Sequence, residues 1–271
     1  MSEKKPNRKF APPRKSLSQN FLIDVNISEK IAASLDSPDS AWVLEIGPGR
    51  GALTGFLIRR FAQVIAVELD DALAEDLPHL LQEPENLQVV HNDFLTMNLD
   101  QGLPCARSAG AVAGSLPYHI TSPILFKIID HRSCFREAVL MVQKEVGERL
   151  TANPGSRSYG IPSVILQLHA DVEYLFTVPA HLFYPRPKVD SAVVHIRFTE
   201  ERERQAADLQ LFGSIVKGVF NQRRKMLRNT LSAFADPAIL ERLTLDLTRR
   251  PETLSVSEFI KLVNEIIRLK G

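Results

Sequence analysis

Three acidic side chains stand at or beside the ends of predicted strands, at spacings that suit a single adenosyl ligand. Glu45 lies in a first short apolar run, Glu68 closes a second, and Asp93 follows a third. Carboxylates at the carboxyl ends of neighbouring strands can accept hydrogen bonds from an ammonium group, from ribose hydroxyls and from the exocyclic amine of adenine. Because S-adenosylmethionine carries all three groups, we expect these acids to bind it as a methyl donor.

A fourth predicted strand ends in Ser115-Leu116-Pro117-Tyr118, which we interpret as the catalytic segment. This pattern suits methylation of an amine conjugated to a ring, whose lone pair is a poor nucleophile. The Ser115 oxygen and the carbonyl of Leu116 or Pro117 can accept the N–H groups of adenine N6 and stabilise its developing charge. Tyr118 offers a face on which the base can stack, and we expect Ser115 to border the donor as well. Taken alone, a proline and a tyrosine after a strand also suit an ordinary turn.

A glycine turn joins the first predicted strand to a helix. Gly47 and Gly49 let the backbone turn tightly and approach a ligand where a Cβ would collide. With Ala52 they also fit the loose pattern of nicotinamide dinucleotide sites, so the turn alone does not select the cofactor. The carboxylate of Glu45 favours a ligand with an ammonium group, because a buried acid needs a donor or a cation. The alternative is an ordinary turn with a solvated Glu45.

Apolar runs alternating with helical periodicity predict an α/β fold, a Rossmann-like class I methyltransferase sheet of seven mostly parallel strands. We assign residues 17–200 to this domain and residues 207–271 to a small C-terminal all-α domain. The expected strands are 42–46, 64–67, 87–91, 109–114, 138–142, 170–178 and 192–198, and the expected helices of the first domain are 27–35, 53–61, 71–81, 121–129 and 163–169.

The C-terminal domain carries a cluster of cations. Apolar spacing from Leu209 onward predicts helices, and the charged segment 199–208 before it is interpreted as a linker. The cluster suits contacts with RNA phosphates, although a charge run is more often a solvated face. Its members are Arg223, Arg224, Lys225 and Arg228.

Two further segments suit RNA. Phe183 lies in the proline-rich segment 179–191 and is a candidate second wall around a base; the alternative is a hydrophobic plug. Residues 1–16 hold six basic residues and three prolines, which predicts a flexible basic arm. The arm is either a solvated tail or a phosphate contact.

Composition sets broad limits. The 271 residues are 44% hydrophobic and 24% charged with a net charge of +1, so bulk charge does not indicate a nucleic-acid binder. Cys105 and Cys134 lack metal-site spacing, and we expect no metal and two reduced thiols in the cytoplasm. No apolar run is long enough for a membrane span. We expect a monomer.

Together, these motifs resemble the ribosomal RNA adenine dimethyltransferases, in particular the bacterial enzymes that act on 16S ribosomal RNA and are associated with kasugamycin sensitivity. The resemblance runs from about residue 15 to about residue 231. It rests on Ser18-Gln19-Asn20-Phe21-Leu22, Glu45-Ile46-Gly47-Pro48-Gly49-Arg50-Gly51, Glu68, Asn92-Asp93, Leu116-Pro117-Tyr118, Gln143-Lys144-Glu145-Val146, Tyr159-Gly160, Pro185-Arg186-Pro187-Lys188-Val189-Asp190-Ser191 and Arg223-Arg224-Lys225-Met226-Leu227-Arg228-Asn229.

The resemblance implies S-adenosylmethionine as donor and two adjacent adenosines near the 3′ end of 16S ribosomal RNA in the 30S subunit as acceptors, each dimethylated on N6. It also implies that Gln19, Asn20 and Leu22 line the cofactor site. Where the family usually has Asn before Leu-Pro-Tyr, this chain has Ser115. We expect activity to survive and the second methylation to be slower, because serine reaches less far.

Three alternatives remain open. The chain could resemble the relatives that dimethylate large-subunit RNA and confer antibiotic resistance. It could be a nicotinamide-dependent oxidoreductase, which Glu45 and the segment 115–118 disfavour. It could also act chiefly as an assembly factor of the small ribosomal subunit, with methylation secondary.

Overall fold

Strand β2 (Trp42–Ile46) is buried on both faces and lies near the middle of a sheet of seven strands. The computed structural model describes residues 12–14, 17, 19–39, 41–105 and 109–270. The strand order is β4-β3-β2-β5-β6-β9-β7, in which the pairs from β4 to β6 are parallel and β9 is antiparallel to both its neighbours. The other strands are β3 (Gln63–Glu68), β4 (Leu87–His91), β5 (Gly110–Ser115), β6 (Phe135–Gln143), β7 (Ala170–Val178) and β9 (Ser191–Phe198).

The mixed, mostly parallel sheet confirms the predicted fold class, and all seven predicted strands are present with small shifts at their ends. A second sheet, which the apolar pattern does not predict, pairs β1 (Phe21–Leu22) antiparallel with β8 (Phe183–Tyr184). The prediction that residues 199–208 form a linker was wrong in part. Residues Glu201–Gln205 form helix α8, where Arg204 pairs with Glu200 one turn earlier.

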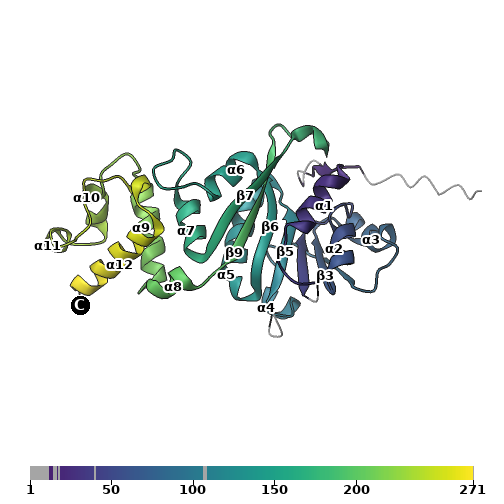
Figure 1. Cartoon of the computed structure of the whole chain (residues 1–271), viewed down its shortest axis with the longest axis horizontal. Helices are drawn as coiled ribbons and strands as arrows, with labels where there is room; N and C mark the ends of the chain where they lie inside the picture. The colour runs from purple at the N-terminus through teal and green to yellow at the C-terminus, as the bar shows by residue number, and fades with distance from the viewer. Residues whose placement is uncertain (1–11, 15–16, 18, 40, 106–108, 271) are drawn as a thin grey trace, which may run out of the picture.

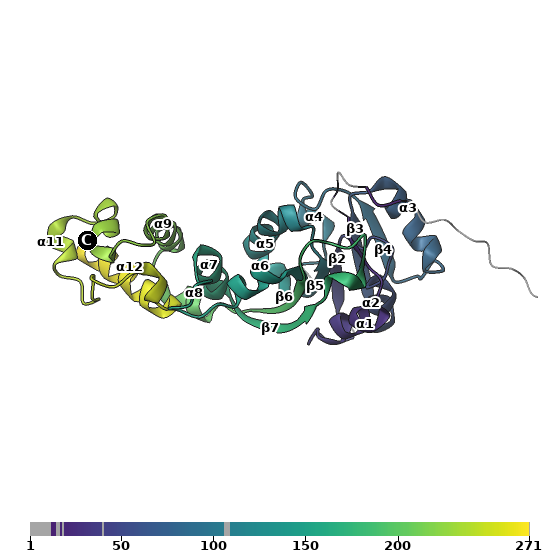
Figure 2. The same cartoon turned by 90° about the horizontal axis from the view of Figure 1, so that it is seen from above.

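Helices cover both faces of the large sheet, as the two cartoon views show (Figure 1, Figure 2). Val43 of β2 packs with α1 and α2, whereas Trp42, Leu44 and Ile46 pack with α5 on the opposite face. This division follows from the alternation of side chains along a strand. The helices of this part are α1 (Val25–Ala33), α2 (Thr54–Arg60), α3 (Asp71–Leu80), α4 (Leu99–Gly102), α5 (Thr121–Asp130), α6 (Lys144–Leu150) and α7 (Ile161–His169).

The C-terminal helices gather at the end of the molecule away from β2, β3 and β4 (Figure 2). They share a separate hydrophobic core, to which α7 contributes Val164 and Leu168. None of the helices among the described residues has the apolar length needed to cross a bilayer. These helices are α9 (Leu209–Phe220), α10 (Leu227–Thr230), α11 (Pro237–Leu240) and α12 (Val256–Lys270).

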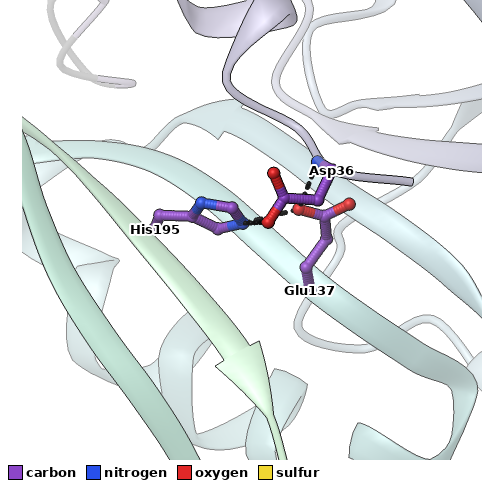
Figure 3. Close-up of side chains that lie close together, drawn as sticks. All are labelled: Asp36, Glu137 and His195. Atoms are coloured by element: carbon purple, nitrogen blue, oxygen red, sulfur yellow. Dashed lines mark hydrogen bonds and ion pairs between the residues drawn. The ribbon is translucent and has the colours of Figure 1, made fainter. Parts of the chain in front are cut away.

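A buried carboxylate fastens the segment after α1 to the sheet (Figure 3). Glu137 of β6 accepts hydrogen bonds from the backbone N–H groups of Asp36 and Ser37, and its Oε2 lies 2.5 Å from His195 Nε2 of β9. Burial alone would raise the pKa of Glu137, but the bonds from His195 and the two backbone groups lower it to about 2. Glu137 is therefore ionised at neutral pH and joins α1 to β6 and β9.

The two cysteines form a disulfide, so the expectation of two reduced thiols was wrong. The Cα atoms of Cys105 and Cys134 lie 4.6 Å apart although 29 positions separate them in sequence. The physical reason is the topology. Because β5 and β6 are adjacent and parallel, the segments that lead into them start at the same edge of the sheet.

Candidate functional site

A cavity lies at the carboxyl ends of β2, β3 and β5, where an open α/β sheet places its ligands. The structure brings all of the predicted catalytic, cofactor-binding and base-stacking residues to this one cavity. Of the predicted residues, its lining includes Gln19, Asn20, Leu22, Glu45, Gly47, Gly49, Glu68, Asp93, Ser115, Leu116, Pro117, Tyr118 and Phe183.

The glycine turn approaches the cavity with left-handed backbone conformations. Gly47 has φ +68° and Gly49 has φ +56°, which side chains other than glycine rarely adopt. A Cβ on Gly49 would also lie 3.1 Å from the ring of Phe21. The Gly49 N–H donates to Oε2 of Glu68 at 3.0 Å. The turn therefore needs glycine at position 49 for its conformation and for the packing of Phe21.

Glu45 is a buried acid with an unfilled acceptor. Its side chain is 1% exposed, and its Oε2 has no hydrogen-bond partner among the described residues. Burial raises the pKa of Glu45 to about 8; Thr54 opposes the rise, and the neighbouring Glu68 adds to it. The site can therefore bind a cationic hydrogen-bond donor beside Glu45. An ammonium group would donate the hydrogen bond that Oε2 lacks, and its positive charge would stabilise the ionised carboxylate.

Glu68 is held by the backbone on both oxygens. Oε2 accepts from Gly49 N–H, and Oε1 accepts from the N–H of Asp70 at 2.9 Å. Burial raises the pKa of Glu68, and these backbone hydrogen bonds oppose the rise. Each oxygen keeps a second lone pair, so the carboxylate can still accept from a pair of hydroxyls.

Asp93 lies half-buried just after β4. Its Oδ1 accepts from Leu95 N–H at 2.8 Å, which fixes the carboxylate at the cavity wall. The second oxygen can accept from an amine in the cavity.

The predicted catalytic segment leaves β5 and turns into helix α5. The Pro117 carbonyl accepts from both Ile120 N–H and the Thr121 hydroxyl, at 3.1 Å each. Both of its lone pairs are thereby used, which favours Leu116 over Pro117 as the carbonyl that can accept from a substrate amine. The Tyr118 hydroxyl bonds to the Ser191 hydroxyl at 2.8 Å.

Phe183 is 4% exposed, belongs to the core that includes α1, and also lines the cavity. The β1–β8 pair brings it there, since Leu22 and Phe183 are register partners. Phe21, which the sequence analysis did not single out, packs on the glycine turn and lies under Arg50, whose guanidinium is 4.3 Å from the ring centroid.

A polar network anchors the segment before β1. Gln19 Nε2 donates to Asp70 Oδ2 at 2.8 Å, and Arg14 pairs with Asp71 at 2.8 Å and with Asp70 at 3.3 Å. Arg14 is the only basic residue of the predicted arm 1–16 that lies within the described residues. There it pairs with protein carboxylates.

The predicted RNA-binding cations lie outside the cavity: Arg223, Arg224 and Lys225 are in the segment between α9 and α10, and Arg228 is in α10 itself. Arg224, Lys225 and Arg228 are exposed. Arg223 is half-buried, donates to the Ser156 carbonyl at 3.2 Å and lies 3.9 Å from Glu252. The structure thus leaves three of the four cations open to a ligand and engages the fourth within the protein.

Among the described residues, one cluster brings together three side chains of metal-ligating type, namely Asp36, Glu137 and His195 (Figure 3). It lies outside the cavity lining. Each carboxylate is already engaged, because Asp36 accepts from Arg197 at 2.7 Å and Glu137 accepts from His195 and the backbone. The cluster therefore explains how α1 is fastened to the sheet.

The chain is similar to known ribosomal RNA methyltransferases in sequence and in fold. The family model described as "Ribosomal RNA adenine dimethylase" matches residues 11–268. The ribosomal RNA small subunit methyltransferase A of Geobacter metallireducens is 41% identical over 268 residues, covering 95% of this chain and 97% of the relative. Its namesake in Bacteroides thetaiotaomicron is 40% identical over 265 residues, with 95% of each chain covered.

Two solved structures share the whole architecture. A dimethyladenosine transferase from Plasmodium falciparum superimposes with a TM-score of 0.78 at 25% identity, covering 91% of this chain and 97% of that one. The 23S rRNA methyltransferase ErmE gives a TM-score of 0.74 at 27% identity, covering 91% and 99%.

Proposed function

This chain belongs to the ribosomal RNA adenine dimethylase family, and on that premise we propose that it dimethylates N6 of two adjacent adenosines in the 3′-terminal hairpin loop of 16S ribosomal RNA, within the small ribosomal subunit. It is an S-adenosylmethionine-dependent ribosomal RNA adenine dimethyltransferase. One observation carries the residue assignments. The three predicted acids and the segment from Ser115 to Tyr118 border one cavity at the carboxyl end of the sheet.

The residues present fit the donor. We assign the buried Oε2 of Glu45 to the ammonium group, Glu68 to the ribose hydroxyls and Asp93 to the adenine amine. Gly47 and Gly49 keep the turn free of side chains where the ligand approaches. When bound, S-adenosylmethionine supplies the methyl group. Gln19, Asn20 and Leu22 complete the cavity from the β1 side.

The acceptor amine is bound at the end of β5. The Ser115 oxygen and the Leu116 carbonyl accept the two N–H groups of adenine N6, so the nitrogen becomes pyramidal and its lone pair is freed from the ring. Tyr118 stacks on the base and stabilises the positive charge on nitrogen, with Phe183 as the second wall. No general base is required, because the N6 proton can leave to water after transfer.

The C-terminal helices bind the RNA away from the site of methyl transfer. Arg224, Lys225 and Arg228 are exposed and suit phosphate contacts, which position a nucleic acid without reading its sequence. Because α10 and the segment before it lie at the end of the molecule away from β3 (Figure 1), the cations that they carry bind RNA that flanks the target loop. Their removal should weaken RNA binding without changing donor affinity.

The direct test uses small ribosomal subunits from a strain that lacks the dimethylation. The subunits are incubated with the protein and labelled S-adenosylmethionine, and the digested RNA is analysed by mass spectrometry. We expect N6,N6-dimethyladenosine from the 3′-terminal loop. Glu68→Ala, which removes the ribose acceptor, serves as the cofactor-binding control.

Other outcomes have clear meanings. Label in large-subunit RNA alone would assign the protein to the type of activity named for ErmE. Failure to transfer to either RNA, together with rescue of subunit assembly by the Glu68→Ala variant, would support a role as an assembly factor.

A further inference from the structure

The hydroxyl of Tyr118 is hydrogen-bonded to the first residue of β9, two strands away from β5 at the same edge of the sheet. Tyr118 is the last residue of the predicted catalytic segment and the first of the short 3₁₀ turn Tyr118–Ile120, and its side chain is only half-buried. Its hydroxyl lies 2.8 Å from the Ser191 hydroxyl, and the two residues are 73 positions apart in the chain. Burial raises the pKa of Tyr118, so the phenol stays protonated and remains a neutral hydrogen-bonding partner.

Ser191 is held in place by the sheet. It is the first residue of β9 and is completely buried. Its backbone lies in register with Gln143 of β6 and with Val178 of β7, so strands hold it on both sides. Ser191 does not line the cavity, and its hydroxyl therefore acts on a substrate only through Tyr118.

Asp190, the residue before Ser191, holds the segment that carries Phe183. Asp190 Oδ1 accepts from the backbone N–H of Ala180 at 2.9 Å, and its carbonyl accepts from Lys144 N–H at 3.0 Å. Ala180 starts the 3₁₀ turn Ala180–Leu182, which runs directly into Phe183. Two consecutive residues thus bond to the two segments that carry Tyr118 and Phe183.

We propose that Ser191 is a positioning residue for methyl transfer, which holds the ring of Tyr118 in the orientation that stacks the target adenine, while Asp190 fixes the segment that carries Phe183. This inference rests on the proposed function. A tyrosine ring on a short turn can change its rotamer, and transfer to a poorly nucleophilic amine depends on the alignment of its lone pair. The Ser191 hydroxyl removes that freedom without touching the substrate.

A double-mutant cycle tests the proposal on the full chain. Ser191→Ala, Tyr118→Phe and the double variant are compared with the wild type on undermethylated small subunits. We expect each single variant to lower kcat by about 3- to 10-fold, the equivalent of one hydrogen bond, with a smaller change in KM for the subunit. The product should shift toward monomethyladenosine. The double variant should be no slower than Tyr118→Phe.

Ser163→Ala provides a matched control. Ser163 is also a completely buried serine with hydrogen bonds, but it lies in α7, outside the cavity. The Ser163→Ala variant should be less stable than the wild type and should have an unchanged kcat.

A second readout needs no turnover. The chain has four tyrosines, so the ring signal of Tyr118 in a ¹³C-tyrosine NMR spectrum is identified by its loss in Tyr118→Phe. That signal should move in Ser191→Ala and stay in place in Ser163→Ala.

The outcomes separate two kinds of failure. If Ser191→Ala slows Tyr118→Phe by the same factor as it slows the wild type, Ser191 acts through general stability and the positioning role is wrong. An unchanged Tyr118 ring signal in Ser191→Ala would also overturn it. If the wild type transfers no methyl group to any ribosomal RNA, the proposed function fails, and the ring signal still decides whether Ser191 positions Tyr118.

Discussion

Glu45 makes binding of S-adenosylmethionine dependent on proton release. Its burial raises the pKa to about 8 in the ligand-free protein, so at pH 7 about nine molecules in ten carry the proton. An ammonium group at Oε2 pairs with the ionised form, which must then lose that proton. Glu45→Gln keeps the shape of the side chain, but its amide does not titrate and so releases no proton when the ligand binds.

The size of the effect follows from that pKa. At pH 7 the wild type should release about 0.9 more proton per bound ligand than Glu45→Gln, and less than about 0.1 more at pH 9. The cost of ionising Glu45 disappears over the same interval. The ratio of the two dissociation constants, variant over wild type, should therefore grow about tenfold between pH 7 and pH 9.

Isothermal titration calorimetry in two buffers with different ionisation enthalpies counts the protons directly. Subtracting the Glu45→Gln result removes protons that the amine of the ligand itself exchanges.

The ligand-free protein gives an independent check through its unfolding free energy. Because the folded pKa is above the usual 4.5, the stability that Glu45 contributes is present in full below about pH 4.5. It is lost as the pH rises from about 4.5 through 8, on the order of 5 kcal/mol in total. Glu45→Gln should not show that loss.

Equal proton release by the wild type and Glu45→Gln at pH 7 would refute this reasoning. The acid would then be ionised before the ligand arrives, or would not meet its cationic end. A ratio of dissociation constants that is the same at pH 7 and pH 9 would lead to the same conclusion.

Three further predictions concern the glycine turn, the buried carboxylate and the catalytic segment. Gly49→Ala should destabilise the protein by about 1–2 kcal/mol, measured by urea unfolding, and weaken donor binding, because the left-handed backbone and the Phe21 ring both resist a Cβ. Glu137→Gln should cost about 3 kcal/mol of stability at pH 7. The wild type should lose this contribution only as the pH falls from about 4.5 through 2. The unfolding free energies of the two proteins, measured as a function of pH, should therefore converge in acid. Ser115→Asn should leave the first methylation intact and raise the ratio of dimethyl- to monomethyladenosine; an unchanged ratio would show that Ser115 does not limit the second transfer.

The sequence could predict the large sheet and the acids of the cavity because both signals are local. Short apolar runs are typical of buried parallel strands, and the carboxyl ends of such strands meet at one edge. Glu45, Glu68 and Asp93 could therefore be placed together without knowing any contact between them. Their distinct states depend on burial, which the sequence does not reveal; the raised pKa of Glu45 is the clearest case.

Contacts between distant segments could not be predicted. Strands β1 and β8 have two residues each, too few to show periodicity, and their pairing joins Phe21 to Tyr184. The disulfide between Cys105 and Cys134 depends on the adjacency of β5 and β6 in the same way. The bond between Tyr118 and Ser191 needs both the sheet order and the turn after β5.

The glycine turn and the second acid, which the sequence presents as separate motifs, form one unit in the structure. The Gly49 N–H donates to Glu68, which also accepts from the Asp70 N–H. The Asp70 side chain caps helix α3 and accepts a hydrogen bond from Gln19, in the segment before β1. A substitution at Gly49 therefore disturbs Glu68, which we assign to the ribose hydroxyls, as well as the loop. The same connection predicts that Gly49→Ala and Glu68→Ala will not be additive in donor affinity, since each disturbs the bond that the other makes.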